Sequence, residues 1–164
     1  LGICNGFQAL IKLGLVPYGD IVPMTAECPT LTFNTIGRHQ SRLVRTRVAS
    51  NLSPWLAKTE VGDMHTIAIS HGEGRFVASD DMLAQLKANG QIATQYVDEA
   101  GVPGMDLSVN PNGSLLAIEG ITSPDGRVFG KMGHSERYSN GTFKNVPGEK
   151  DQPLFAAGVE YFAA

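Results

Sequence analysis

The chain has 164 residues with 13 basic and 16 acidic side chains, a formal net charge of −3 that gives no reason to expect a nucleic-acid partner. Its 42% hydrophobic and 18% charged residues are typical of a globular protein. We therefore expect a single domain over residues 1–164 with a core of its own. No apolar run approaches the roughly 20 residues of a membrane span. Two cysteines do not make a disulfide framework, which favours a reducing, cytoplasmic setting.

The first ten residues, LGICNGFQAL, predict the end of a strand, a sharp turn and the start of a helix. Residues 1–3 suit the strand and residues 4–6 the turn. Apolar side chains then recur at the spacing of one helix face, at Phe7, Leu10 and Ile11. Gly14 has the position of a helix cap, and a loop rich in proline and glycine follows it.

The rest of the chain alternates between strand and helix patterns. Apolar patterns predict strands at residues 31–34, 41–49, 64–70, 91–97, 115–122 and 127–132. Ser53 and Pro54 predict a short capped turn, and Asp125-Gly126 predicts the turn of a hairpin. Asp80 is expected to cap a helix that stops at Asn89-Gly90, and the tail predicts a helix at about 152–162.

Strands that alternate with helices indicate an α/β fold, with extra antiparallel strands near the end of the chain. The opening residues look like the end of a buried strand, and such a strand needs neighbours on both of its edges. We therefore expect the chain to be the carboxyl-terminal part of a larger domain.

Cys4 is a candidate nucleophile. Gly2 and Gly6 flank it two residues away on either side, which is the spacing of a nucleophile elbow. Small residues suit such a turn because strand and helix backbones approach closely. The start of the following helix is expected to lower the pKa of the thiol. The alternative is that Cys4 is a small buried hydrophobic residue, as free cysteines often are.

His134 and Glu136 are the candidate partners of this cysteine. A nucleophilic thiol needs an imidazole base, and the second nitrogen of that imidazole needs an acceptor that fixes its tautomer. His134 follows a predicted strand, and Glu136 lies two residues further on. In an extended segment this spacing places both side chains on one side. The alternative is a surface loop whose polar residues contact only water.

Four motifs occur in the order GICNGFQ, HGEGR, NPNGS and MGHSER. Together they resemble the glutaminase domain of phosphoribosylformylglycinamidine synthase, a class I glutamine amidotransferase of purine biosynthesis. The resemblance covers nearly the whole chain, to about Tyr161. The stretch NTIGRHQSRLVRTRV further resembles the large single-chain form, in which this domain is the carboxyl-terminal part. GHSER stands where many relatives have Pro-His-Pro-Glu-Arg, and the amino-terminal third of the domain is absent from the 164 residues.

The resemblance implies a flavodoxin-like three-layer sandwich with a mixed, mostly parallel sheet. It also implies that Cys4 attacks L-glutamine, that His134 is base and acid, and that Glu136 orients His134. The backbone N–H of Asn5 would be one oxyanion donor, and the other would lie on a loop before the cysteine strand. The residues implied in substrate binding are Gln8, Gly37, Arg38 and Ser41. Because one donor is missing, we expect the chain alone to have little activity.

The remaining motifs are given smaller roles. His71 at a strand end is more often a structural residue than a second base, with the HGEGR loop bordering the pocket. NPNGS is a turn sequence, and the resemblance makes Asn110 and Asn112 part of the pocket wall. Cys28 lacks an elbow and is not expected to be catalytic. Four histidines without paired ligand spacing argue against a metal site.

Partners and cofactors follow from the resemblance alone. We expect no cofactor in this chain, whereas ATP and magnesium belong to the synthase part of the intact protein, which would receive the ammonia. Nucleic acid and membrane are not expected partners. Two other functions stay open: a cysteine peptidase or chaperone-like protein that shares the elbow, and a non-catalytic interaction module.

Overall fold

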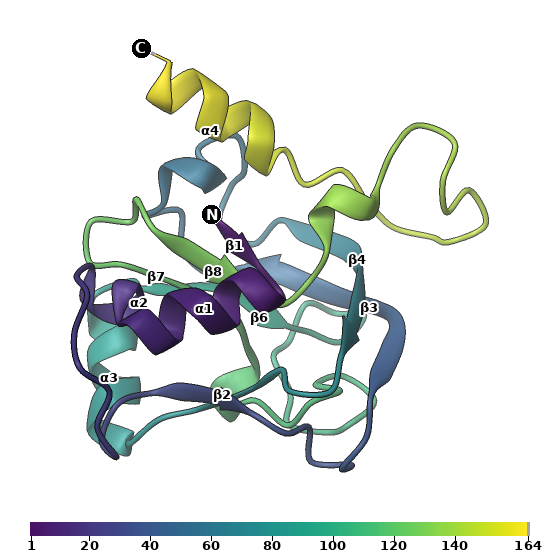
Figure 1. Ribbon diagram of the computed structural model, residues 1–164. Helices are drawn as coiled ribbons and strands as arrows, with labels where there is room; N and C mark the ends of the chain where they lie inside the picture. Colours follow the sequence, from purple (N-terminus) through teal and green to yellow (C-terminus); the bar gives the residue numbers. More distant parts are fainter. Residues whose placement is uncertain (164) are drawn as a thin grey trace.

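A computed structural model describes residues 1–163 as an α/β fold built on a curled six-stranded sheet (Figure 1). In spatial order the strands are β1 (Gly2–Ile3), β8 (Phe129–Lys131), β7 (Ile118–Thr122), β6 (Ile92–Tyr96), β3 (Gln40–Val48) and β4 (Met64–His71). A separate pair is formed by β2 (Thr30–Thr32) and β5 (Arg75–Val77). The α/β class is confirmed, but β5 was not predicted, since only the HGEGR loop was expected before residue 76. No helix among residues 1–163 is long and apolar enough to cross a membrane.

The strand pairing of the main sheet is mixed, as predicted, but it is not mostly parallel. Only β1 and β8 pair in parallel, and the other four described pairs of this sheet are antiparallel. Consecutive strands that pair in parallel need a long crossover connection, usually through a helix. Where the connection is short, the neighbouring strands pair antiparallel. Strands β7 and β8 are instead joined by a tight turn, in which Gly126 N–H donates to the Ser123 carbonyl at 2.9 Å.

Helix α1 (Asn5–Leu13) follows the capping signal of the sequence, and helix α3 (Asp80–Ala88) differs from its predicted cap by one residue. Helix α1 ends at Gly14 with φ 85°, as predicted, and a short helix α2 (Leu15–Tyr18) follows it within the predicted loop. Helix α3 begins after Ser79, whose side chain accepts a hydrogen bond from the Met82 N–H. The cap is therefore Ser79 and not Asp80, which lies in the first turn.

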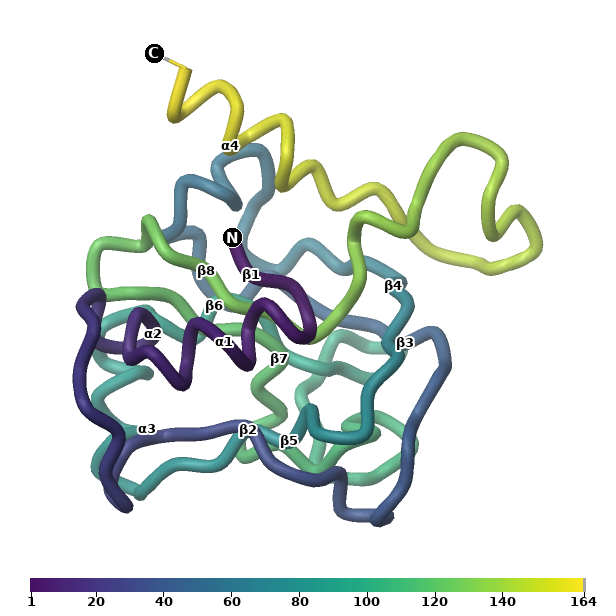
Figure 2. Tube along the Cα trace, viewed as in Figure 1, coloured from purple at the N-terminus to yellow at the C-terminus, as the bar shows by residue number. Residues whose placement is uncertain are grey.

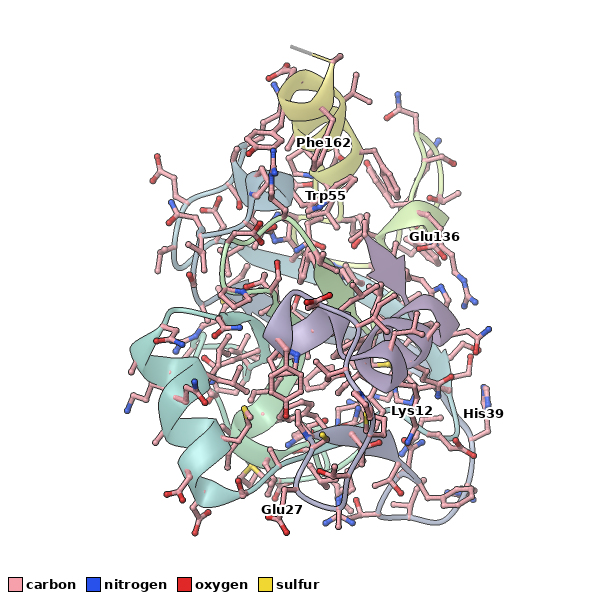
Figure 3. The ribbon with its side chains drawn as sticks, turned by 60° about the vertical axis from the view of Figure 1, so that its left-hand side comes forward. Lys12, Glu27, His39, Trp55, Glu136 and Phe162 are labelled. Carbon is pink, nitrogen blue, oxygen red and sulfur yellow. The ribbon has the colours of Figure 1, made fainter. Side chains whose placement is uncertain are left out.

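Helix α4 (Leu154–Phe162) packs with a short 3₁₀ helix at one end of the sheet. It lies against the 3₁₀ helix η1 (Pro54–Leu56), which Ser53 caps as predicted. The rings of Trp55 and Phe162 meet there with centroids 5.4 Å apart (Figure 3). Helices α4 and η1 together cover one face of the sheet.

Buried side chains on the two faces of the sheet form separate clusters. On one face, α1 and α3 contribute Phe7, Ile11 and Leu86 to a cluster that includes Ile121 of β7. On the other face, Leu154 of α4 packs with Val48, Leu56, Ala93 and Phe129. The arrangement has three layers: helices α1 and α3, the sheet, and α4 with η1.

The sheet curls until its two ends approach each other. Strand β4 is at one end of the strand order and β1 with β8 is at the other. The chain that leaves β8 nevertheless bridges β4, with Ala68 opposite His134 in an isolated antiparallel bridge. The tube in Figure 2 shows the segment after β8 passing beside β4. The curl therefore places the ends of β1 and β8 against the free edge of β4.

The close packing of α1 on β8 generates a stability prediction. A Cβ on Gly130 would lie 2.2 Å from Cδ2 of Phe7, a buried ring of α1. We expect Gly130→Ala to lower the free energy of unfolding by about 1–3 kcal/mol, the usual cost of overpacking. Gly72→Ala is the matched control, because a Cβ there has nothing within 4 Å. Urea denaturation of both variants gives the comparison, and equal losses would contradict the packing.

Candidate functional site

Cys4 forms the turn that joins β1 to α1. Its backbone has φ 53° and ψ −105°, a conformation that is costly for a residue with a side chain. Two hydrogen bonds hold it: the Cys4 N–H donates to the Lys131 carbonyl at 2.8 Å, and the Cys4 carbonyl accepts from the Gln8 N–H at 3.1 Å. Strained residues held in this way are common at functional sites. The turn places the thiol at the carboxyl end of β1.

A glycine before the turn allows β1 and α1 to approach closely. A Cβ on Gly2 would lie 2.5 Å from Cδ1 of Leu10 and 2.7 Å from the backbone carbonyl of Gly6. The predicted need for a small residue is confirmed at Gly2. At Gly6 it is wrong, because a Cβ there would have nothing within 4 Å.

The Cys4 thiol is partly buried, and its Sγ lies 3.6 Å from the Ser70 carbonyl oxygen. Burial disfavours the charged thiolate and raises the pKa of Cys4 above its ordinary value. The Asn5 backbone N–H and the Arg137 side chain lower this pKa, and Glu136 raises it. The prediction of a lowered pKa is therefore wrong in its net direction, because burial outweighs the N–H at the start of α1.

His134 and Glu136 form a hydrogen-bonded pair. Nδ1 of His134 lies 2.5 Å from Oε1 of Glu136. The two residues do not lie in an extended segment as predicted, since His134 precedes the 3₁₀ helix η3 (Ser135–Arg137). Figure 3 shows Glu136 projecting from this turn. Nε2 of His134 is buried and has no hydrogen-bond partner among residues 1–163, so it is the free nitrogen of the ring.

The edge of β4 brings the cysteine and the histidine together. The His134 N–H donates to the Ala68 carbonyl at 2.8 Å, and Cys4 Sγ contacts the Ser70 carbonyl. Ala68 and Ser70 are two residues apart on one strand, so their carbonyls point to the same side. The Cys4 thiol and the His134 backbone therefore both contact this edge of β4, although 130 positions of the sequence separate them.

The segment implied in substrate binding lies partly on β3, which pairs with the other edge of β4. Ser41 of β3 is paired with Ser70 of β4, whose carbonyl contacts the thiol. Gly37 forms a turn with φ 67°, and its neighbour Arg38 is exposed. Gln8 lies one helical turn after Cys4, and its Nε2 donates to the Glu73 carbonyl at 2.8 Å. Gln8 thereby connects α1 to the loop at residues 72–74.

Asn34 is a site-forming residue that sequence reasoning missed. Its Oδ1 accepts from the Gly74 N–H at 3.1 Å and lies 3.2 Å from Nδ1 of His71. Its Nδ2 donates to the carbonyls of Arg38 and His71 at 3.0 and 2.8 Å. One buried amide therefore ties the turn at residues 34–38 to the loop after β4. Only its place at a strand end before a glycine turn could have drawn attention to it.

Asn110 and Asn112 do not line an open pocket, which corrects their assignment to the pocket wall. Both side chains are fully buried. Asn112 Nδ2 donates to the Gly74 carbonyl at 2.7 Å, and Asn110 Nδ2 donates to the Ser114 carbonyl at 2.8 Å. Asn112 thereby supports the loop at residues 72–74, whereas Asn110 holds the turn at residues 110–114, because a buried amide must find hydrogen-bond partners within the protein.

Other concave or polar features lie away from Cys4. Pockets of about 470 and 450 Å³ are lined in part by Arg47 and Lys87 and by Arg42 and Asp98, and neither is lined by Cys4 or His134. Within residues 1–163, no group of three or more histidine, cysteine, aspartate or glutamate side chains is placed to hold a metal ion. The candidate site is therefore an edge of β4 with a thiol, an imidazole and a carboxylate.

Comparison with known proteins gives a family match over almost the whole chain. Residues 1–162 match the CobB/CobQ-like glutamine amidotransferase domain. The chain is 40% identical to the phosphoribosylformylglycinamidine synthase subunit PurQ of Aquifex aeolicus, over 85% of this chain and 56% of that protein. It is 36% identical to the PurQ subunit of Thermomicrobium roseum, over 84% of this chain and 52% of the relative.

A solved structure gives the same result for the fold. The structure of PurLQS from Thermotoga maritima matches with a TM-score of 0.69 and 30% sequence identity, over 98% of this chain and 60% of that chain. The α/β architecture is thus that of a known amidotransferase structure. The chain spans between half and two thirds of the length of these relatives.

His71 generates a prediction on acid stability. Burial lowers the pKa of His71 to about 4 from an ordinary 6.5, with smaller contributions from neighbours that include His39 and His134. Above pH 6.5 the residue is neutral in both states. As the pH falls towards 4, the unfolded chain takes up a proton that the folded chain does not accept. The free energy of unfolding is therefore expected to decline, by on the order of 3 kcal/mol from this residue.

The measurement compares His71→Asn with the unsubstituted chain. Asparagine keeps a polar group near Asn34 but does not titrate, so the decline between pH 6.5 and 4 should be smaller in the variant. Urea denaturation at several pH values measures the two slopes. Parallel slopes would show that His71 is protonated as readily in the folded chain as in the unfolded one.

Proposed function

The chain belongs to the CobB/CobQ-like glutamine amidotransferase family, and from this premise we propose that it hydrolyses L-glutamine through Cys4, His134 and Glu136. The observation that carries the proposal is the edge of β4, where the strained Cys4 contacts the Ser70 carbonyl and the backbone N–H of His134 donates to the Ala68 carbonyl. The ring of His134 is in turn hydrogen-bonded to Glu136. A thiol, a base and an acceptor that orients the base are the groups that acyl transfer requires.

The first half of the reaction forms a thioester. Glu136 accepts the Nδ1 hydrogen of His134 and so leaves Nε2 as the basic nitrogen. Nε2 takes the proton of Cys4, and the sulfur attacks the side-chain carbonyl carbon of glutamine. The Asn5 N–H stabilises the negative oxygen of the tetrahedral intermediate. His134 then gives its proton to the departing nitrogen, the C–N bond breaks, and ammonia leaves.

The second half of the reaction restores the cysteine. Water attacks the thioester carbon while His134 takes one of its protons, and the C–S bond breaks. The protonated imidazole returns the proton to the sulfur, and glutamate leaves. The raised pKa of Cys4 supports this use of a base, because a thiol that stays protonated attacks only when a neighbouring group removes its proton.

The substrate is held by groups beside the thiol. We assign the amino-acid end of glutamine to the backbone at residues 37–41, including Gly37, Arg38 and Ser41, because β3 pairs with β4 beside Cys4. Gln8 faces the same region from α1, and its Nε2 is held by Glu73, so its Oε1 is the atom that remains for the substrate.

The ammonia is proposed to serve a synthase. The relatives are named as subunits of phosphoribosylformylglycinamidine synthase, which supports delivery of ammonia for conversion of formylglycinamide ribonucleotide to formylglycinamidine ribonucleotide. ATP and magnesium would be bound by the synthase part and not by this chain. Because these relatives are named as subunits, the single-chain form expected from residues 34–48 stays a prediction.

Glutamate release tests the function directly. It is measured for the 164-residue chain alone and for the chain within its assembled synthase, because the relatives are longer than this chain. The low activity expected of the 164 residues alone stays a prediction that this comparison decides. Release of glutamate that Cys4→Ala abolishes supports the glutaminase. Peptide cleavage without glutamate release would favour a peptidase, and neither activity in the assembled synthase would favour an interaction module.

Labelling separates the two cysteines. We expect the glutamine analogue 6-diazo-5-oxo-L-norleucine to modify Cys4, since that thiol has a base and a substrate site beside it. A hydrogen bond with Thr25 lowers the pKa of the partly buried Cys28, which should react instead with iodoacetamide.

The variants Cys4→Ala and Cys28→Ala provide the matched controls for this experiment. The first should abolish labelling by the glutamine analogue, and the second should leave it unchanged, with intact mass as the measurement. Equal labelling of both cysteines by the analogue would mean that Cys4 is an ordinary thiol.

A further inference from the structure

Lys131 is a buried cation directly behind the candidate site. Its side chain has no exposed surface. Its Nζ donates to the Gly133 carbonyl at 2.8 Å and to the Ser135 hydroxyl at 2.9 Å, and lies 3.4 Å from Oε1 of Glu119. Gly133 and Ser135 are the two chain neighbours of His134. The ammonium group therefore binds the carbonyl of the residue before His134 and the hydroxyl of the residue after it.

Glu119 completes the set of contacts from the neighbouring strand. Its Oε1 accepts from the Gly133 N–H at 2.5 Å, and its Oε2 accepts from the hydroxyl of Thr94 on β6. The Ser135 hydroxyl donates onward to Oε1 of Gln152, just before α4, at 2.6 Å. The peptide groups of Gly133, next to His134, are thus bonded by side chains from β7 and β8, and Thr94 of β6 holds the Glu119 carboxylate.

From this geometry we propose that Lys131 and Glu119 are positioning residues that hold the His134 imidazole at the distance and angle the Cys4 thiol needs. Lys131 acts on both partners, because its backbone carbonyl accepts the Cys4 N–H at 2.8 Å while its side chain holds the flanks of His134. The inference rests on the proposed function, since it assigns a cause to the geometry of that site.

The energetics of a buried pair favour a role beyond stability. Burial lowers the pKa of Lys131, and the Glu119 carboxylate beside it opposes that shift. Taking two charges out of water costs several kcal/mol per ion, and an apolar pair of similar volume is often as stable or more so. The space is also restricted, since a Cβ on Gly133 would lie 2.1 Å from Cδ1 of Ile67. What the two charged side chains add is directed hydrogen bonds, which fix the orientation of the Gly133 N–H and carbonyl beside His134.

The test removes both charges at once. In Lys131→Met/Glu119→Gln the glutamine still reaches the Gly133 N–H and the Thr94 hydroxyl, whereas the links from Lys131 to Gly133 and Ser135 are lost. No unpaired charge is left buried, so we expect the variant to fold with a Tm near that of the unsubstituted chain. Within the assembled synthase, its kcat for glutamate release should fall about 10- to 100-fold, with KM changed less than about twofold.

A second readout needs no turnover. The Nδ1–H of His134 bonded to Glu136 should give a downfield proton resonance in the ¹⁵N-histidine-labelled 164-residue chain, assigned by its loss in His134→Ala. We expect this resonance to shift or broaden in Lys131→Met/Glu119→Gln. A variant that keeps both the resonance and the kcat of the unsubstituted protein overturns the proposal.

Two controls separate positioning from charge and from stability. Lys58→Met/Glu160→Gln removes the same two charges from a surface pair whose atoms lie 2.6 Å apart, and should leave the resonance and kcat unchanged. Leu86→Ala creates a cavity in α3 and should lower Tm without moving the resonance. If Leu86→Ala reduces kcat as much as the paired variant does, stability and not positioning is the cause, and the proposal is wrong.

A third variant covers the case in which the paired variant does not fold. Ser135→Ala removes only the hydroxyl between Lys131 and Gln152, and should lower kcat by a smaller factor with KM unchanged. An unchanged kcat for Ser135→Ala would then overturn the proposal. Failure of the proposed function would give a different result, because the assembled synthase would then release no glutamate. In that case the histidine resonance in the chain and its variants would still test whether Lys131 and Glu119 position His134.

Discussion

The curl of the sheet is the constraint on which the candidate site depends. Cys4 follows one terminal strand of the sheet, and β4 is the strand at the opposite end. In a flat sheet these strands would lie about five strand spacings apart, each of roughly 4.8 Å. Curling brings the Ser70 carbonyl to the Cys4 thiol and the Ala68 carbonyl to the His134 N–H. The site is therefore a product of how the two ends of the sheet meet, and small changes in the curl change the distance between thiol and imidazole.

Local signals in the sequence predicted the elements well, because each is decided within a few residues. The strand–turn–helix at Cys4, the end of α1 at Gly14 and the hairpin at Asp125-Gly126 all have the predicted form. The predictions that went wrong depend on partners far along the chain. The sheet is mostly antiparallel because of its strand order, and β5 is a strand because β2 pairs with it across some 45 positions.

The candidate site shows the same division. The hydrogen bond between His134 and Glu136 could be predicted, since two residues of spacing keep the side chains within reach. The function of Asn34 could not, because its four contacts join segments that only the fold brings together. The pKa of Cys4 was predicted in the wrong direction for a related reason. The start of α1 is visible in the sequence, but the burial that outweighs it comes from the tertiary fold, in which Cys4 packs against the core and contacts the Ser70 carbonyl of β4.

The raised pKa of Cys4 gives the buried pair of Lys131 and Glu119 its importance. A thiol with a lowered pKa is reactive by itself and tolerates an imprecisely placed base. Under the proposed function, a thiol that burial keeps protonated depends on the base, so its reactivity depends on the position of His134. That position is set by Gly133 and Ser135, whose partners are the two buried charges. The same curled sheet that contacts the thiol therefore also supplies, from its interior, the contacts that hold the proposed base.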